Sequence, residues 1–265
     1  FSSRNFYFSA PWFFGGITQE YVIGLEKGLA IIEAFGLHKG PMTLTQTAEV
    51  TGHTKASVRR CLLTLCKLGY AVQEGRQFQL APRALRLGHA YVSSDRLTKI
   101  AQPLLEMTSE RTKESASLAV LDSQHTVFVA RSTYRRSLSS GLGVGARLPA
   151  YCSATGRVLL SELPETDVKF LLNRMSRPAF TPHTLTNLRD ILHEIRLVRT
   201  QGYAISDEEL EIGLRSIAVP VRNAAGEMIA ALSLSVSTSR MTRAAILEKL
   251  LPELETTRRN FATLL

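Results

Sequence analysis

Apolar residues recur at helical spacing in the segment 24–35. The members of this stripe lie three or four positions apart and are Leu25, Leu29, Ile32 and Phe35. An amphipathic helix buries such a stripe against its neighbours. The pattern therefore predicts a helix whose leucine face lies in the core of a first domain.

Two further helices are predicted on either side of a turn at Gly52. Thr43 and Gln46 have the spacing of a capping box, so a short helix is expected at 44–50. Thr54 is positioned to cap a second helix, 55–68. The apolar stripe that this helix would bury consists of Val58, Cys61, Leu62, Leu65 and Leu68. A short helix, a glycine-containing turn and a second helix form the helix-turn-helix arrangement.

The polar face of the second helix carries candidate DNA contacts. At its N-terminal end these are Thr54, Lys55, Ser57, Arg59 and Arg60. In a helix-turn-helix the second helix enters the major groove with its N-terminal residues on base edges. Arginine pairs bidentately with guanine, while hydroxyls and lysine bind bases or phosphates. The alternative is that these charges only solvate an ordinary amphipathic helix, and the polar face alone does not decide.

Two short strands directly after this helix favour DNA binding. They are expected at 70–73 and 77–80 and are joined by Glu74-Gly75-Arg76. Glycine allows the positive φ that a tight hairpin turn requires. A hairpin in this place is the wing of a winged helix, with Arg76 at its tip to reach a phosphate or the minor groove. The order of elements predicts a winged helix-turn-helix over residues 21–86 that binds a double-stranded DNA operator.

Length and charge agree with this interpretation. A chain of 265 residues favours two domains. The net charge is +9, and residues 21–90 hold 9 Lys and Arg against 4 Asp and Glu, whereas the remainder from residue 91 holds 22 against 18. The positive excess is therefore concentrated where a polyanion is expected. No apolar run is long enough to predict a membrane span.

The cysteines and the first residues of the chain indicate in which cellular compartment the protein is expected. Three cysteines without a CxxC pair argue against disulfides and a structural zinc site, and fit a reducing cytoplasm. Residues 1–20 are rich in aromatic side chains without periodicity, and a secretory signal is a poor fit. They are expected to be a poorly ordered leader or tag-like segment.

Strand and helix patterns alternate beyond the first domain. A linker helix is expected at 87–100 and a second domain at 101–265, which gives an α+β protein. An amphipathic helix that carries Ile100, Leu104, Leu105 and Met107 is expected after the linker helix. The expected strands are 115–121, 126–131, 203–206, 216–221 and 228–236, and the further expected helices are 153–163 and 188–200.

The last predicted strand has one face of small polar side chains. Ala231, Ser233 and Ser235 alternate with Leu232 and Leu234, so the two sets point to opposite faces. The hydroxyls would form either a solvent-facing surface or the floor of a polar pocket.

The helix that begins near Ser153 offers a complementary wall. A helix N-terminus presents free amides and partial positive charge, which suit an anion. Ala154 and Thr155 are small enough for close approach, and Arg157 in the first turn is expected to bind the ligand with them. Asp207 would either accept a hydrogen bond from a ligand hydroxyl or pair with an arginine.

Two longer motifs resemble a known family. Residues 147–157 read RLPAYCSATGR and residues 207–220 read DEELEIGLRSIAVP. Both are similar to the effector domain of IclR-family bacterial transcription regulators, and the resemblance runs from about residue 21 to the C-terminus. Segments at 58–62, 68–70, 87–91 and 101–103 look like the PcaR, PcaU and PobR branch, which controls protocatechuate and 4-hydroxybenzoate breakdown through the β-ketoadipate pathway.

This resemblance implies a dimer, often paired into a tetramer, with a GAF-like second domain. The effector would be a small organic acid of the protocatechuate, 4-hydroxybenzoate or β-ketoadipate type. The family's ligand positions correspond to Ala154, Thr155, Asp207, Ser216, Ser233 and Ser235. Some relatives carry Cys where this chain has Ser216, and some bind zinc. The sequence offers no convincing His and Cys ligand set, so neither a metal nor another cofactor is expected.

Other functions remain as alternatives. The chain could regulate a different carboxylate pathway, or act as a DNA-bound scaffold without a ligand. An enzyme with Cys152 or a serine as nucleophile is not expected, because no GxSxG motif occurs and no histidine stands in a triad context. The glycines of 141–145 lack the strand and helix of a dinucleotide fold.

Overall fold

The computed structural model describes residues 21–38, 40–134 and 142–265, and the predicted leader at 1–20 lies outside them. Two compact units divide at Ser94 and Asp95. We call residues 21–94 the N-terminal unit and the described residues from 95 to 265 the C-terminal unit. In the described part of the chain, no helix is long and apolar enough to cross a membrane.

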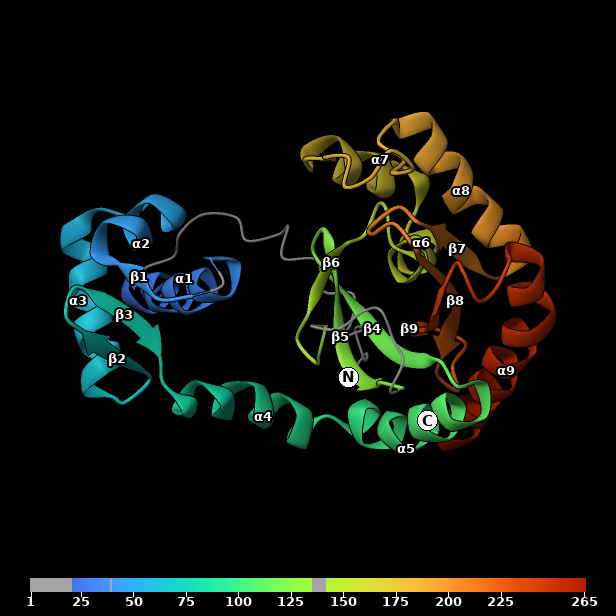
Figure 1. Ribbon diagram of the computed structural model, residues 1–265, viewed down its shortest axis with the longest axis horizontal. Coiled ribbons are helices and arrows are strands. Elements are labelled where there is room, and N and C mark those ends of the chain that lie inside the picture. The colour runs from blue at the N-terminus through green and yellow to red at the C-terminus, as the bar shows by residue number, and fades with distance from the viewer. Residues whose placement is uncertain (1–20, 39, 135–141) are drawn as a thin grey trace. The chain divides into compact units, whose positions relative to one another are not determined.

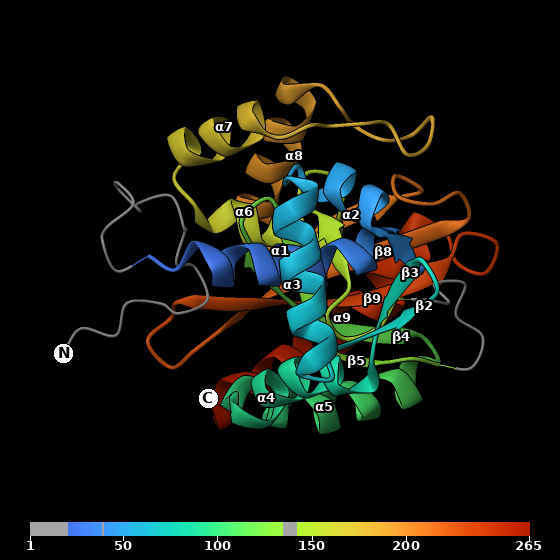
Figure 2. The ribbon, with the colours of Figure 1, turned by 90° about the vertical axis from the view of Figure 1, so that its left-hand side faces the viewer.

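The N-terminal unit is a helix-turn-helix with a three-stranded sheet. Its elements are α1 Ile23–His38, β1 Met42–Thr43, α2 Leu44–Thr51, α3 Lys55–Lys67, β2 Ala71–Glu74 and β3 Gln77–Leu80. The sheet order is β1-β3-β2, and Figure 2 shows the β2–β3 hairpin beside α3. The predicted capping box of Thr43 and Gln46 is present, and Gly52 ends α2 with a φ of 69°. These local predictions are confirmed.

The buried faces of α1 and α3 differ from the predicted stripes. Leu25 and Leu29 are 62% and 47% exposed, whereas Ile31 and Ala34 are buried together with Phe35. Because α2 and α3 pack on the side of α1 that carries Ile31, the leucine stripe faces outward. Leu68 is 52% exposed because α3 ends at Lys67 and Leu68 is its C-cap.

The predicted linker helix 87–100 and the amphipathic helix predicted after it are both present, but the break between them lies at Asp95. A short 3-10 turn, Pro82–Ala84, leads into α4, Leu85–Ser94, and α5 spans Arg96–Thr112. The Asp95 side chain caps α5 by accepting hydrogen bonds from the amides of Leu97 and Thr98. Since Leu97 is buried in the core of the C-terminal unit, this unit begins at Asp95 and not at residue 101.

The C-terminal unit is built on a six-stranded antiparallel sheet in the order β6-β5-β4-β9-β8-β7. Its strands are β4 Ser115–Asp122, β5 His125–Ser132, β6 Arg147–Pro149, β7 Ala204–Asp207, β8 Leu214–Arg222 and β9 Met228–Ser237. Its helices after α5 are α6 Ala154–Glu162, α7 Glu165–Arg174, α8 Leu188–Gln201 and α9 Arg243–Leu264. The predicted strands and helices are present, while β6, α7 and α9 were not predicted.

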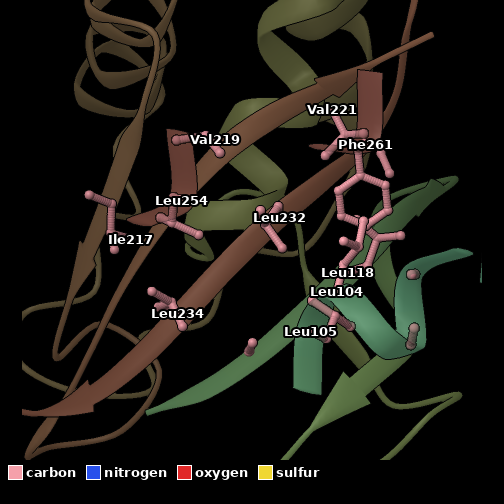
Figure 3. Close-up of a cluster of buried hydrophobic side chains, with 14 of the residues drawn as sticks. Leu104, Leu105, Leu118, Ile217, Val219, Val221, Leu232, Leu234, Leu254 and Phe261 are labelled. Atoms are coloured by element: carbon pink, nitrogen blue, oxygen red, sulfur yellow. The ribbon is translucent and has the colours of Figure 1, made fainter. Parts of the chain in front are cut away.

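Helices cover both faces of this sheet. Helices α5 and α9 lie on one face and α6 and α8 on the other (Figure 1). Figure 3 shows the first of these interfaces, where Leu232 and Leu234 of β9 pack with Leu104, Leu105 and Phe261. On the other face Ala231 packs with Ala154 of α6. The predicted alternation of β9 is therefore confirmed, and its serine face lies on the α6 side.

Candidate functional site

The exposed side of α3 presents most of the predicted DNA contacts. Thr54 caps the helix, with its Oγ1 accepting from the Ser57 amide at 3.3 Å. Thr54, Lys55, Arg59 and Arg60 are all exposed. The side chains that a double helix would meet first are therefore available to solvent at the N-terminal end of α3.

Ser57 differs from the other predicted DNA contacts of α3 because it is buried. Its side chain is only 7% exposed, and it lines the groove between α1 and α3 together with Thr64 and Leu65. Because Ser57 lines this groove with residues of α1, its side chain faces α1 rather than outward. Ala56, Leu63 and Lys67 are exposed instead and were missed. Their spacing of seven and four could have identified them as one outward stripe.

The hairpin tip has the predicted geometry. Glu74 pairs with Gln77, so Gly75 and Arg76 form a two-residue turn in which Gly75 has a φ of 59°. The Gln73 side chain donates to the Gly75 carbonyl at 2.9 Å and braces this turn. Arg76 is exposed at the tip.

Four strands align serines across the α6 face of the C-terminal sheet. The strand registers place opposite one another, in order, Ser206, Ser216, Ser235 and Ser115, which we call the serine row. The hydroxyls of Ser216 and Ser235 are 2.9 Å apart. The predicted polar face is therefore wider than one strand. Ser115 and Ser206 were missed as members, although each lies on a predicted strand.

A second row on the same face contains a buried cation. Ser233 lies opposite Ser117, and Ser117 lies opposite Arg131. Arg131 is 8% exposed and donates from its Nη1 to Ser117 Oγ at 3.0 Å. Burial lowers the pKa of Arg131. Arg131 was expected only as the last residue of a strand, because no periodic pattern marks a buried arginine.

The start of α6 lies against these rows. Ser153 caps the helix through the Gly156 amide at 3.1 Å, and Ala154 and Thr155 are buried. The Thr155 hydroxyl donates to Thr126 of β5 at 3.3 Å. The Ser206 hydroxyl donates to the Cys152 carbonyl at 2.8 Å, which joins the serine row to the residues before α6.

Arg157 is buried in an ion pair with Glu209. Its side chain is 1% exposed, and its two terminal nitrogens each donate to a carboxylate oxygen of Glu209 at 2.6 Å. Its Nε donates to the Tyr151 carbonyl at 3.2 Å. Glu209 therefore already neutralises the charge of Arg157 inside the protein, which argues against the predicted contact between Arg157 and an anionic effector.

Asp207 pairs with an arginine, which is the second of the two alternatives predicted for it. Its carboxylate accepts from Nε of Arg215 at 2.6 Å, and Arg215 also donates to the Met241 carbonyl at 2.8 Å. Asp207 and Arg215 are opposite each other in the β7–β8 register, and Arg215 is opposite Val236 of β9. Because side chains alternate along a strand, this pair lies on the sheet face that carries Val236, opposite the face of the serine row.

The described residues do not favour a nucleophilic role for Cys152 or a metal site. Cys152 is fully buried, and burial raises the pKa of its thiol to about 12, so a thiolate is disfavoured. Among the side chains that the structure describes, no group of three or more His, Cys, Asp and Glu gathers to hold a metal ion.

Comparison with known protein families covers both units. The IclR helix-turn-helix domain matches residues 24–75, and the C-terminal domain of IclR bacterial transcriptional regulators matches residues 89–262.

Curated relatives extend over nearly the whole chain. The Pca regulon regulatory protein of Pseudomonas putida is 43% identical over 234 residues, which are 88% of this chain and 80% of the relative. The p-hydroxybenzoate hydroxylase transcriptional activator of Acinetobacter baylyi is 39% identical over 246 residues, covering 91% of this chain and 90% of the relative.

Solved structures agree in fold. A putative transcriptional regulator from Rhodococcus sp. RHA1 has a TM-score of 0.78 at 38% identity, covering 92% of this chain and 98% of its own. The inducer-binding domain of a PobR double mutant from Acinetobacter, in complex with 3-hydroxybenzoic acid, has a TM-score of 0.60 at 35% identity. It covers 63% of this chain and 98% of its own. The predicted α+β class is confirmed, and the chain belongs to the IclR family of bacterial transcription regulators.

Proposed function

We propose that this regulator binds a DNA operator through α3 and the β2–β3 wing, and that a small aromatic acid in the C-terminal unit controls this binding. The observation that carries the proposal is a polar floor, made of the serine row and the Arg131 row, beneath the start of α6 in a chain that also carries a winged helix. Ser216 and Ser235 of this floor are half-buried and its other members are buried. A purely structural sheet has no need of so many buried hydroxyls on one face.

The DNA contacts follow from exposure and charge. Arg59 and Arg60 are long, charged and exposed on α3, and such side chains read guanine edges in the major groove. Lys55 and Thr54 lie at the helix start, where phosphates are bound. Arg76 at the braced wing tip binds the backbone or the minor groove. Ser57 has no direct role in this proposal.

The proposed effector contacts come from the polar face of the sheet and from the start of α6. Ser216, Ser233 and Ser235 supply hydroxyls from the sheet, while Ala154 and Thr155 supply small side chains at the helix start. Relatives suggest the ligand class, since one relative is a p-hydroxybenzoate hydroxylase activator and a similar inducer-binding domain holds 3-hydroxybenzoic acid. The proposed effectors are protocatechuate and 4-hydroxybenzoate.

A homodimer in the cytoplasm completes the proposal. Two DNA-binding domains are needed to bind paired operator half-sites that lie one helical turn apart. Leu25, Leu29 and Leu68 leave an apolar groove of about 550 Å³ between α1 and α3 that faces solvent in the single chain. Such a patch is typical of an interface. We infer that a second copy of this chain covers it, and that pairing of dimers yields a tetramer.

The experiment measures ligand binding and DNA binding on the same full-length protein. An operator selected from random duplexes would be titrated by fluorescence anisotropy with no acid and with protocatechuate, 4-hydroxybenzoate or β-ketoadipate. Thermal shift under the same conditions reports ligand binding alone. The proposal expects that an aromatic acid stabilises the protein and changes operator affinity.

Other outcomes separate the alternatives. Stabilisation and regulation by β-ketoadipate alone would keep the sensing role but make the effector an aliphatic acid of the same pathway instead of an aromatic one. Tight operator binding with no response to any acid would favour a scaffold and would contradict the sensing role. Sedimentation of the wild type against a Leu25→Glu/Leu29→Glu variant tests the dimer, which the variant is expected to lose.

A further inference from the structure

We propose that the outward stripe of α3, made of Ala56, Leu63 and Lys67, reads a thymine in the operator, with Leu63 packed against the C5 methyl group of that base in the major groove. This inference rests on the proposed DNA binding and concerns what the operator must contain. It places a thymine close to the guanines that Arg59 and Arg60 would contact.

Leu63 is an exposed leucine on a helix that buries other large apolar side chains. Val58, Leu62 and Leu65 of α3 lie in the core of the N-terminal unit, whereas Leu63 is 40% exposed. Figure 2 shows α3 in front of α1 with the β2–β3 hairpin beside it, so the core lies behind α3. Leu63 is therefore on the side of α3 that a double helix would approach.

Positive charges lie on both sides of Leu63 along the helix. Arg59 and Arg60 are one turn before it and Lys67 is one turn after it, and all three are exposed. The central part of a protein–protein interface is depleted in charged residues, whereas DNA-binding surfaces are strongly positive. The charge around Leu63 therefore favours DNA over a second protein chain as the partner of this surface.

The hydroxyl that follows Leu63 in the sequence is bonded to the helix itself. Thr64 Oγ1 donates to the carbonyl of Arg60 at 2.8 Å. At this level α3 therefore presents the methyl groups of Leu63 to the DNA. Thymine is the base that carries a methyl group in the major groove, and apolar side chains contact it there. The chemistry of this position thus matches thymine.

The spacing along α3 sets the distance between the thymine and the guanines. With a rise of about 1.5 Å per residue, Leu63 lies about 4.5 to 6 Å along the helix axis from Arg60 and Arg59. Base pairs repeat every 3.4 Å or so, which puts the contacts about one to two base pairs apart where α3 follows the groove. Ala56 lies two turns before Leu63 on the same stripe, and its short side chain allows close approach to the bases.

The test removes the methyl group from the DNA. In operator duplexes selected from random DNA, each thymine in turn would be replaced by deoxyuridine, which lacks only the C5 methyl group. Fluorescence anisotropy would measure their affinity for the full-length protein. The wild type is expected to lose about fourfold in affinity at one or two thymines of a half-site, as expected for the lost burial of one methyl group.

Two protein variants assign this methyl contact. In Leu63→Ala the loss caused by deoxyuridine should disappear, because the side chain that contacts the methyl group is absent. Leu37→Ala is the matched control, since Leu37 is 76% exposed on α1 of the same unit. This control should lose affinity for the deoxyuridine duplexes as the wild type does.

The outcomes separate this inference from the proposed DNA binding. Equal deoxyuridine losses in the wild type and Leu63→Ala, or no loss at any thymine in the wild type, would overturn the inference and leave operator binding intact. A Leu63→Ala variant that sediments as a smaller species than the wild type would assign Leu63 to a protein interface, which also contradicts the inference. Failure of the wild type to select any operator from random duplexes would overturn the proposed DNA binding and this inference with it.

Discussion

Arg157 and Glu209 form a two-pronged ion pair inside the C-terminal unit, with both nitrogen to oxygen distances at 2.6 Å. The same Glu209 carboxylate accepts from the Leu185 amide at 3.1 Å. The pair therefore fixes the first turn of α6 to the segment after β7 and to the loop before α8. Since Ala154 and Thr155 belong to that turn, the ion pair positions the wall of the proposed effector site.

Removing one partner of this pair is expected to destabilise the protein strongly. Arg157→Gln leaves the Glu209 charge buried without its cation, which costs about 3–5 kcal/mol in comparable buried pairs. Urea unfolding measures the loss. The matched control is Arg196→Gln, which breaks an equally two-pronged but exposed pair with Glu165 and should cost far less. Equal losses for the two variants would show that burial does not determine the strength of the pair.

Much of the local structure was predictable because it depends on near neighbours. The Thr43 and Gln46 capping box, the Gly75 turn and the alternation of β9 each rest on residues a few positions apart, and the structure confirms them. The direction of the α1 stripe was not predictable in the same way. Leu25 has the right spacing, but the packing of α2 and α3 decides which side of α1 is covered.

The site was predictable only in part. The serines of β9 and the small residues at the start of α6 followed from strand alternation and from motif resemblance. The role of Arg157 did not, because its partner Glu209 is 52 residues away in the sequence. Arg131 was missed for a related reason, since its burial depends on the pairing of β5 with β4 and no local signal reports it.

Gly156 is expected to tolerate no side chain. A Cβ at this position would lie 2.2 Å from the Ala150 carbonyl oxygen, which belongs to rigid backbone. Gly156→Ala should therefore displace α6 and lower the melting temperature measured by circular dichroism. Gly88→Ala is the control, because Gly88 is also helical and its Cβ would meet no atom within 4 Å. That control should be neutral or stabilising, as alanine favours helix by about 1 kcal/mol. An unaffected Gly156→Ala variant would mean that α6 adjusts freely.

Glu114 is expected to make stability depend on pH. Its side chain is buried beside Arg240, and burial raises its pKa despite the ion pair at 2.7 Å. The folded protein therefore holds this proton more tightly than the unfolded chain does. The resulting stability is present below the ordinary glutamate pKa of about 4.3 and is lost as pH rises through the raised value.

The Glu114→Gln variant isolates this effect because glutamine does not titrate. We expect the unfolding free energy of the wild type, relative to this variant, to fall as pH rises from about 4 towards neutrality. Urea unfolding at several pH values measures the difference. Glu110→Gln changes a carboxylate that is 73% exposed and should give no such fall. A wild-type advantage that grows with pH would show that attraction to Arg240 outweighs burial.

The DNA contacts are expected to fall into two classes. Arg59→Ala or Arg60→Ala removes a proposed base contact from α3 and should weaken specific binding by about 1–3 kcal/mol, with little effect on random duplexes. Arg76→Ala removes a proposed backbone contact at the wing and should weaken binding to both kinds of DNA by the same factor. It should also reduce the slope of log affinity against log salt by about 1.

The Ser57→Ala variant changes a buried residue of α3 and serves as the contrast to the three exposed arginines. Its hydroxyl is buried between α1 and α3, so this change is expected to leave both the preference for operator over random DNA and the salt slope unchanged. Anisotropy titrations on the two duplexes at several salt concentrations measure all four variants together. Equal losses on operator and random DNA for every arginine variant would contradict the division into base and backbone contacts. A loss of preference in Ser57→Ala would show that the groove between α1 and α3 controls how α3 meets the major groove.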